Sequence, residues 1–153
     1  MQKILQAFLV FLMLTSFVFG QTSSSTAEDD ITLIKSFISD IADETLRPDV
    51  ILSQHVLLEK TETDEEYDYL EASIEEIRIN LQPKNIHEIA YIPFHALPNR
   101  ETRDIDPEGK PTDKMYFLRY KNRQMLAVYI AQNKIASFTL VSKGDNKAHF
   151  VTY

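Results

Sequence analysis

The clearest structural pattern in the sequence is the stretch Lys114–Tyr153, KMYFLRYKNRQMLAVYIAQNKIASFTLVSKGDNKAHFVTY. It contains four runs rich in β-branched and aromatic residues, separated by three short polar breaks, which is typical of strands joined by turns. The four runs are Met115–Tyr120, Met125–Ala131, Ile135–Ser142 and His149–Tyr153. Breaks this short cannot hold the crossover that parallel strands require, so the pattern predicts an antiparallel β-meander.

Two amphipathic helices are predicted before the meander. In the first, isoleucines recur at three- and four-residue spacing from Ile31 to Ile41, Ser25 or Thr26 can serve as the cap, and order starts near Glu28. This helix should stop at Arg47-Pro48, because the residue before proline avoids helical angles.

The second helix begins at a capping box. In Thr63-Asp64-Glu65-Glu66, the Thr63 hydroxyl and the Glu66 carboxylate can each satisfy a main-chain N–H of the other residue. An apolar face follows at Tyr67, Leu70, Ile74, Ile77 and Leu81, and Pro83 ends the pattern. The fold class expected from these elements is α+β, with two main N-terminal helices packed on a curled antiparallel β-meander.

Two further segments complete the prediction. Residues 49–62 fit either a short helix capped by Asp49 or a strand over Val56–Leu58, and the sequence leaves both readings open. Asn85–Phe94 is predicted to be a strand with Pro93 at a sheet edge, and Leu97–Asp113 is predicted to be a long polar loop.

The first twenty residues have the pattern of a signal peptide. Lys3 precedes an apolar run from Ile4 to Phe19, which is shorter than a membrane-spanning helix needs. We therefore expect a cleaved signal peptide at 1–20, a flexible tether at 21–27 and a single α+β domain at 28–153. The protein is expected to be exported to the periplasm or the medium, without a membrane span after cleavage.

Composition argues against several functions. The formal net charge is −7, and loss of Lys3 with the leader makes it one unit more negative, so nucleic acid is an unsuitable partner. There is no cysteine, which removes thiol chemistry, and only three glycines, which leaves no dinucleotide or phosphate-binding loop. No cofactor is predicted.

One loop resembles the start of a calcium-binding loop. Asp104, Asp106 and Glu108 alternate before Gly109, and alternating oxygens followed by glycine suit this cation. The twelfth position, which should supply a bidentate carboxylate, is Met115. The alternative is an acidic surface loop stiffened by proline.

The order helix, short element, helix, strand and meander resembles the cystatin-like architecture, in particular the nuclear transport factor 2-like cone fold. This resemblance implies a sheet wrapped around a helix with a pocket at the open end, a fold that hosts both enzymes and binding modules. The cystatin inhibitor signature Gln-x-Val-x-Gly is approached by Gln54-His55-Val56-Leu57-Leu58, in which Leu58 replaces the glycine.

These observations predict a small exported module that binds without catalysing a reaction. Its partner would be a small apolar ligand or another exported or envelope protein. The alternative is a cone-pocket enzyme that uses acid–base chemistry, with His55 or His87 beside a carboxylate and Tyr91 as an oxyanion donor. Histidines His95 and His149 have no assigned role in either reading.

Overall fold

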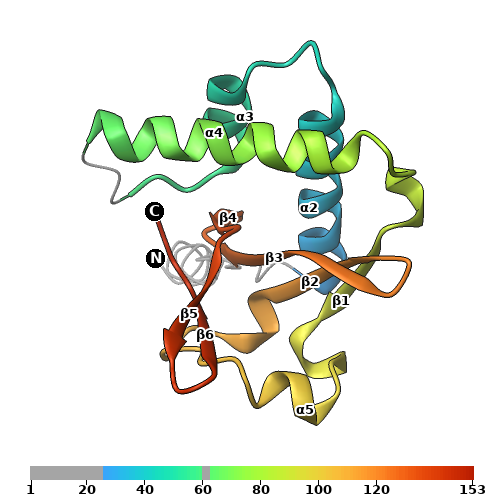
Figure 1. Cartoon of the computed structure of the whole chain (residues 1–153), viewed down its shortest axis with the longest axis vertical. Coiled ribbons are helices and arrows are strands. Elements are labelled where there is room, and N and C mark those ends of the chain that lie inside the picture. The colour runs from blue at the N-terminus through green and yellow to red at the C-terminus, as the bar shows by residue number, and fades with distance from the viewer. Residues whose placement is uncertain (1–25, 60–62) are drawn as a thin grey trace, which may run out of the picture.

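The computed structural model describes residues 26–59 and 63–153 (Figure 1). The predicted signal peptide at 1–20 lies outside these residues, and so does the predicted tether apart from Thr26 and Ala27. Thr26 caps the first described helix and Ala27 is its first residue, so this helix begins one residue before the predicted start at Glu28.

The described residues form four α-helices and two antiparallel sheets, and the predicted α+β class is confirmed. The helices are α2 (Ala27–Ala42), α3 (Pro48–His55), α4 (Asp64–Leu81) and α5 (Asn99–Thr102). The strands are β1 (Ala90–Pro93), β2 (Met115–Tyr120), β3 (Arg123–Ala131), β4 (Lys134–Ser137), β5 (Leu140–Gly144) and β6 (Lys147–Phe150). Short 3-10 helices cover Ile86–Glu88, Phe94–Ala96 and Thr112–Lys114.

Capping boxes start both long helices. In α4 the predicted box is confirmed, because the Thr63 hydroxyl accepts a hydrogen bond from Glu66 N and the Glu66 carboxylate accepts one from Thr63 N. In α2 the same exchange joins Thr26 and Asp29, which settles the choice of cap in favour of Thr26.

The predicted end of the first helix at Arg47-Pro48 is wrong. The helix α2 stops at Ala42, where the Asp43 side chain accepts a hydrogen bond from Thr45 N and stabilises a turn. Pro48 instead begins α3, a position that proline favours because its missing N–H would have no helical partner.

The stretch 49–62 does contain a short helix, but α3 begins at Pro48 with Arg47 as its N-cap residue, so the predicted cap at Asp49 is wrong. The strand predicted over Val56–Leu58 is reduced to a single bridge between Val56 and Ile135 of β4, and residues 60–62 lie outside the described residues.

The meander is divided into two sheets. Strands β1, β2, β3 and β4 form one antiparallel sheet in that order, whereas β5 pairs only with β6. The prediction of one continuous run at Ile135–Ser142 is wrong, because Phe138 and Thr139 interrupt it. The Ser137 hydroxyl bonds both the N–H and the carbonyl of Thr139, and this local turn replaces the ladder there.

The strand predicted at Asn85–Phe94 is shorter than expected. The Asn85 side chain accepts a hydrogen bond from His87 N and favours a 3-10 turn over Ile86–Glu88, so the strand begins only at Ala90. Pro93 does lie at a sheet edge, where it is opposite Tyr116 of β2.

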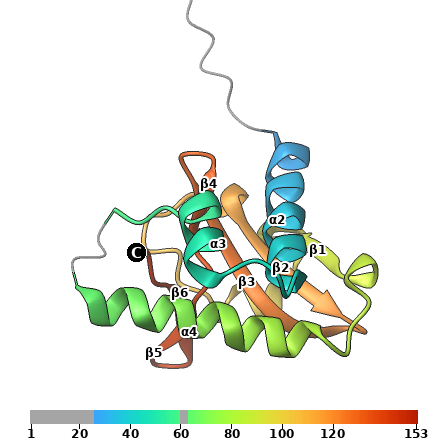
Figure 2. The same ribbon diagram turned by 90° about the horizontal axis from the view of Figure 1, so that it is seen from above.

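Both faces of the four-stranded sheet are covered. On one face Tyr116, Leu118, Val128 and Ile130 pack against the helices, which contribute residues such as Phe37. On the other face the alternate residues pack against Phe150 and Leu97, and these are Met115, Phe117, Ala127 and Tyr129. Figure 1 shows α3 and α4 above the sheet with β5, β6 and α5 below it, and Figure 2 shows the helical layer from above.

Less of the segment 97–113 is irregular loop than the sequence predicted. Leu97 is buried in the second core cluster, α5 follows at once, and Ile105 forms a bridge with Ala148 of β6. This bridge ties the segment to the hairpin β5–β6. None of the helices over the described ranges 26–59 and 63–153 has the length and apolarity to cross a membrane.

Candidate functional site

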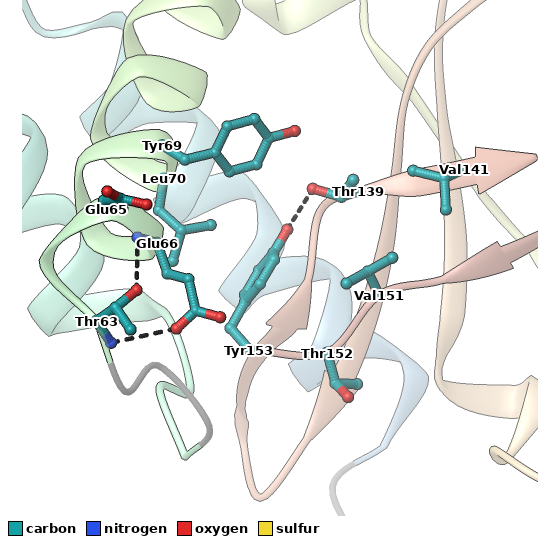
Figure 3. Close-up of a pocket in the computed structure, with 10 residues that line it drawn as sticks. All are labelled: Thr63, Glu65, Glu66, Tyr69, Leu70, Thr139, Val141, Val151, Thr152 and Tyr153. Atoms are coloured by element: carbon teal, nitrogen blue, oxygen red, sulfur yellow. Dashed lines mark hydrogen bonds between the residues drawn. The ribbon is translucent and has the colours of Figure 1, made fainter.

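A hollow of about 590 Å³ lies between the N-terminal half of α4 and the hairpin β5–β6 with the residues that follow it (Figure 3). We call it the α4–hairpin groove. Its helical wall consists of Thr63, Glu65, Glu66, Tyr69 and Leu70. Its other wall consists of Thr139, Val141, Val151, Thr152 and Tyr153.

Apolar side chains that face solvent gather in this groove. In the described part of the chain, four large apolar residues are exposed: Ile79 (64%), Tyr69 (59%), Val141 (36%) and Val151 (36%). All of them except Ile79 line the groove. Concentration of exposed apolar side chains in one hollow is typical of a binding surface rather than of scattered surface residues.

The register of the hairpin explains why the valines face outward. Leu140 is opposite Phe150 in the β5–β6 pair, and both pack into the second core cluster. Because successive side chains of a strand point to opposite faces, Val141 and Val151 are left on the outer face. Figure 3 shows Tyr69 projecting from α4 and both valines on the hairpin across from it.

Tyr153 forms a fixed part of the groove wall. Its hydroxyl accepts a hydrogen bond from Phe138 N at 3.1 Å and also bonds the Thr139 hydroxyl, and its ring lies 5.1 Å from that of Phe138. Burial raises the pKa of Tyr153, so its hydroxyl stays neutral. The main-chain oxygen of Tyr153 accepts a hydrogen bond from Glu59 N, which holds this end of the wall to the segment after α3.

The rim of the groove is acidic. Glu65 and Glu66 lie on the helical wall, and no lysine or arginine is among the described residues that line the groove. The Glu66 carboxylate is engaged in the capping box with Thr63. The exposed Glu65 therefore supplies a negative charge beside an apolar surface.

A second hollow of about 360 Å³ lies between α2 and the segment that leads into β1, and we call it the α2–β1 hollow. Its polar lining residues are Lys35, Ser39, His87 and Tyr91. Its apolar lining is three isoleucines, namely Ile38, Ile86 and Ile89.

The structure brings together only part of the predicted acid–base site. His87 and Tyr91 line the α2–β1 hollow, but no carboxylate of the part of the chain that the structure describes lines it with them. His55 does lie beside a carboxylate, with Nε2 2.6 Å from Asp40 Oδ2. However, His55 is buried against Phe37 and lines neither hollow. The described residues thus do not assemble the predicted catalytic group in one cavity.

The remaining two histidines lie apart from both hollows. His95 is exposed in a 3-10 helix after β1. His149 lies on β6 with Nδ1 2.9 Å from Glu108 Oε2, although the contact is not aligned as a hydrogen bond.

The predicted calcium residues are occupied by basic side chains. Lys143 Nζ of β5 lies 2.8 Å from both Asp106 Oδ2 and Glu108 Oε1, whereas Asp104 points to Arg103. Hydrogen bonding to Lys143 lowers the pKa of Asp106 and lowers that of Glu108 to about 2. Over the described ranges no group of three histidine or acidic side chains is arranged to hold a metal ion, and the calcium loop stays a prediction.

Sequence reasoning did not identify the groove. The sequence offered one indication of the groove, namely Tyr69, an aromatic residue that lies outside the apolar face of α4. The outward valines could not be selected from the sequence, because the division of the third run into β4 and β5 sets which residues face out.

Comparison of the chain with protein-family models, with curated proteins and with solved structures finds no match. The resemblance to the cystatin-like and nuclear transport factor 2-like folds therefore stays a prediction. The stretch Gln54–Leu58, which approaches the inhibitor signature, forms the end of α3 and an extended segment here.

Proposed function

We propose that this protein is a binding module that holds a ligand with an apolar body and a positive charge in the α4–hairpin groove. The observation that carries this proposal is the gathering of Tyr69, Val141 and Val151, which face solvent in one hollow. Burial of these side chains against a ligand would release ordered water and favour binding.

The dimensions and the charge of the groove support this ligand class. Its volume of about 590 Å³ falls in the range of about 300 to 1,000 Å³ found for small-molecule sites. Glu65 at the rim attracts a cation, and the net charge of −7 strengthens the attraction over a longer distance.

Octyl compounds that share one chain and differ in head group test the proposal. Octyltrimethylammonium, octyl glucoside and octyl sulfate are titrated below their micelle concentrations into the ¹⁵N-labelled protein, with binding followed by NMR shifts. We expect the cation to bind most tightly and the anion most weakly, with the shifts centred on Tyr69, Val141 and Val151.

Exposed apolar residues on one helix provide a matched pair of variants. Tyr69→Ser removes an apolar side chain from the groove, and Ile79→Ser removes one of similar exposure from the same helix outside it. We expect Tyr69→Ser to weaken binding by about tenfold, the equivalent of about 1.4 kcal/mol, while Ile79→Ser leaves it unchanged. Equal effects of the two variants, or equal binding of the three compounds, would contradict the proposal.

Export through the signal peptide at 1–20 is part of the proposal. It rests on the sequence pattern of a charged start and a short apolar run. Recovery of the protein from the periplasm or the medium, followed by N-terminal sequencing, tests it, and we expect the mature chain to start near Gln21.

A further inference from the structure

We propose that the α2–β1 hollow is a second binding site, for a small carboxylate that carries a short hydrocarbon body. This site is separate from the α4–hairpin groove, shares no lining residue with it and takes a ligand of opposite charge. It also gives a role to His87 and Tyr91, which the sequence had marked as candidate functional residues.

The hollow contains hydrogen-bonding side chains that the rest of the protein does not use. Lys35 Nζ lies 5.6 Å above the centre of the Tyr91 ring, and it has no carboxylate partner in the ranges that the structure describes. The side chains of Ser39, His87 and Tyr91 likewise make no hydrogen bond within these ranges. An ammonium group, two hydroxyls and an imidazole can all donate to one bound anion.

The charge of the ligand follows from the side chains that line the α2–β1 hollow. Acidic residues are frequent in the chain, yet none of those in the described ranges 26–59 and 63–153 lines the hollow. The two carboxylates nearest in sequence are engaged elsewhere, since Glu88 accepts a hydrogen bond from Asn85 Nδ2 and Asp40 lies against His55. Lys35 is therefore the dominant charge facing the hollow, and it attracts an anion.

The shape and the apolar lining limit the size of the ligand. A volume of about 360 Å³ is near the lower end of about 300 to 1,000 Å³ for ligand sites, so a short hydrocarbon body fits and a large one does not. The three isoleucines of the lining would cover that body. Burial raises the pKa of Tyr91, which keeps its hydroxyl protonated and able to donate to the carboxylate.

Three probes with one hydrocarbon chain separate charge from apolar contact. Hexanoate, hexanol and hexylammonium are titrated into the full ¹⁵N-labelled protein by NMR. We expect hexanoate to shift the amide signals of residues 35–39 and 86–91 and to bind at least about tenfold more tightly than hexanol. Hexylammonium should produce no shifts there.

Two lysines that each stack on a tyrosine supply the variant and its control. Lys35→Met removes the charge at the hollow, and Lys121→Met removes one that lies 5.2 Å from the centre of the Tyr120 ring, away from the hollow. Both lysines are exposed, so both variants should fold, which their amide spectra verify. We expect Lys35→Met to weaken hexanoate binding by about tenfold and Lys121→Met to leave it unchanged.

The outcomes that would overturn this site are distinct from those for the groove. Tyr69→Ser should leave hexanoate binding intact, because Tyr69 lies only in the groove. An equal loss with Lys121→Met, equal binding of hexanoate and hexylammonium, or no shift at millimolar hexanoate would each refute the carboxylate site. None of these results would bear on the binding of octyltrimethylammonium.

Discussion

Tyr116 Oη donates a hydrogen bond to Asp30 Oδ2 across 2.9 Å and joins the first turn of α2 to the second strand of the main sheet. Asp30 is only 2% exposed, and Lys114 Nζ lies 2.8 Å from the same oxygen. A buried carboxylate is tolerated here because a cation and a hydroxyl both satisfy it. Burial, aided by Asp30, raises the pKa of Tyr116 and keeps its hydroxyl available as the donor.

Removal of the Asp30 carboxylate should strongly destabilise the protein. Asp30→Ala takes one buried acceptor away from both Tyr116 and Lys114, and such a loss costs about 3 to 5 kcal/mol. Tyr116→Phe removes a single hydrogen bond and should cost about 1 to 2 kcal/mol. Urea unfolding measures both values. Glu28→Ala, which changes an exposed acid in the same helical turn, serves as the control, and a similar loss in this variant would contradict the assignment.

Substitution of Arg78 should destabilise the protein nearly as much as substitution of Asp30. This buried guanidinium donates to the main-chain oxygens of Ile41 and Leu46 and to the Glu75 carboxylate, so it satisfies the end of α2 and the turn after it. Arg78→Ala is expected to cost about 3 to 5 kcal/mol, and Arg78→Lys about 2 kcal/mol because an ammonium lacks the planar fork. The exposed pair of Arg47 with Asp49 is the comparison, since Arg47→Ala should cost less than about 1 kcal/mol.

The two buried charges show what the sequence could and could not reveal. Asp30 lies four residues before Ile34, and Arg78 lies four residues after Ile74, so both continue the apolar stripe of their helix. Their positions on these stripes indicate from the sequence alone that both side chains are buried. Their partners were not predictable, because Tyr116 and Ile41 approach them only in the folded chain.

In the sheet, too, local patterns were predictable from the sequence and contacts between distant residues were not. Alternation correctly placed Val128 and Ile130 on one face of β3, since that pattern is local. The break at Phe138–Thr139 was missed because the local turn at Ser137 is joined by distant contacts that the sequence does not show. Phe138 N donates to the Tyr153 hydroxyl, and the Phe138 ring packs 5.8 Å from that of Phe37. The α4–hairpin groove follows from this break, so it could not be predicted before the fold was known.

Asparagine at the hairpin turns should contribute measurably to stability. Each two-residue turn has positive φ at both positions and ends in asparagine, at Asn122, Asn133 and Asn146. Asn133→Ala should cost about 1 kcal/mol, because alanine adopts the left-handed region poorly, while Asn133→Gly should cost little. Thermal unfolding tests this, and equal effects of alanine and glycine would contradict a conformational cause. Asn80→Ala, on the exposed face of α4, is the control.

The Glu108 carboxyl should titrate at unusually low pH. Lys143 first, and then His149 and Lys110, lower the pKa of this carboxyl from an ordinary 4.5 to about 2. Its contribution to stability is therefore present above pH 4.5 and is lost as the pH falls toward 2. In a ¹³C NMR titration, Lys143→Gln should raise this pKa toward 4.5. Lys147→Gln should leave it unchanged, because Lys147 Nζ bonds the main-chain oxygen of Arg103 instead.

Calcium and Lys143 compete for the same oxygens, which makes the calcium prediction testable. A cation at Asp106 and Glu108 would have to displace the ammonium that already lies 2.8 Å from each of them. We therefore expect trypsin to cut at Arg100 and Arg103 at the same rate in calcium and in chelator, whereas Lys110 is protected in both because Pro111 follows it.

The Lys143→Gln variant separates the two readings of this loop. If Lys143 holds the loop to β5, the variant should be cut faster than the unmodified protein, equally with calcium and with chelator, because the ion pairs to Asp106 and Glu108 are gone. If the loop is a calcium site, the variant lacks the competing ammonium, and calcium should protect it more than it protects the unmodified protein. Calcium-dependent protection that grows in this variant would replace the ion-pair reading with a metal site.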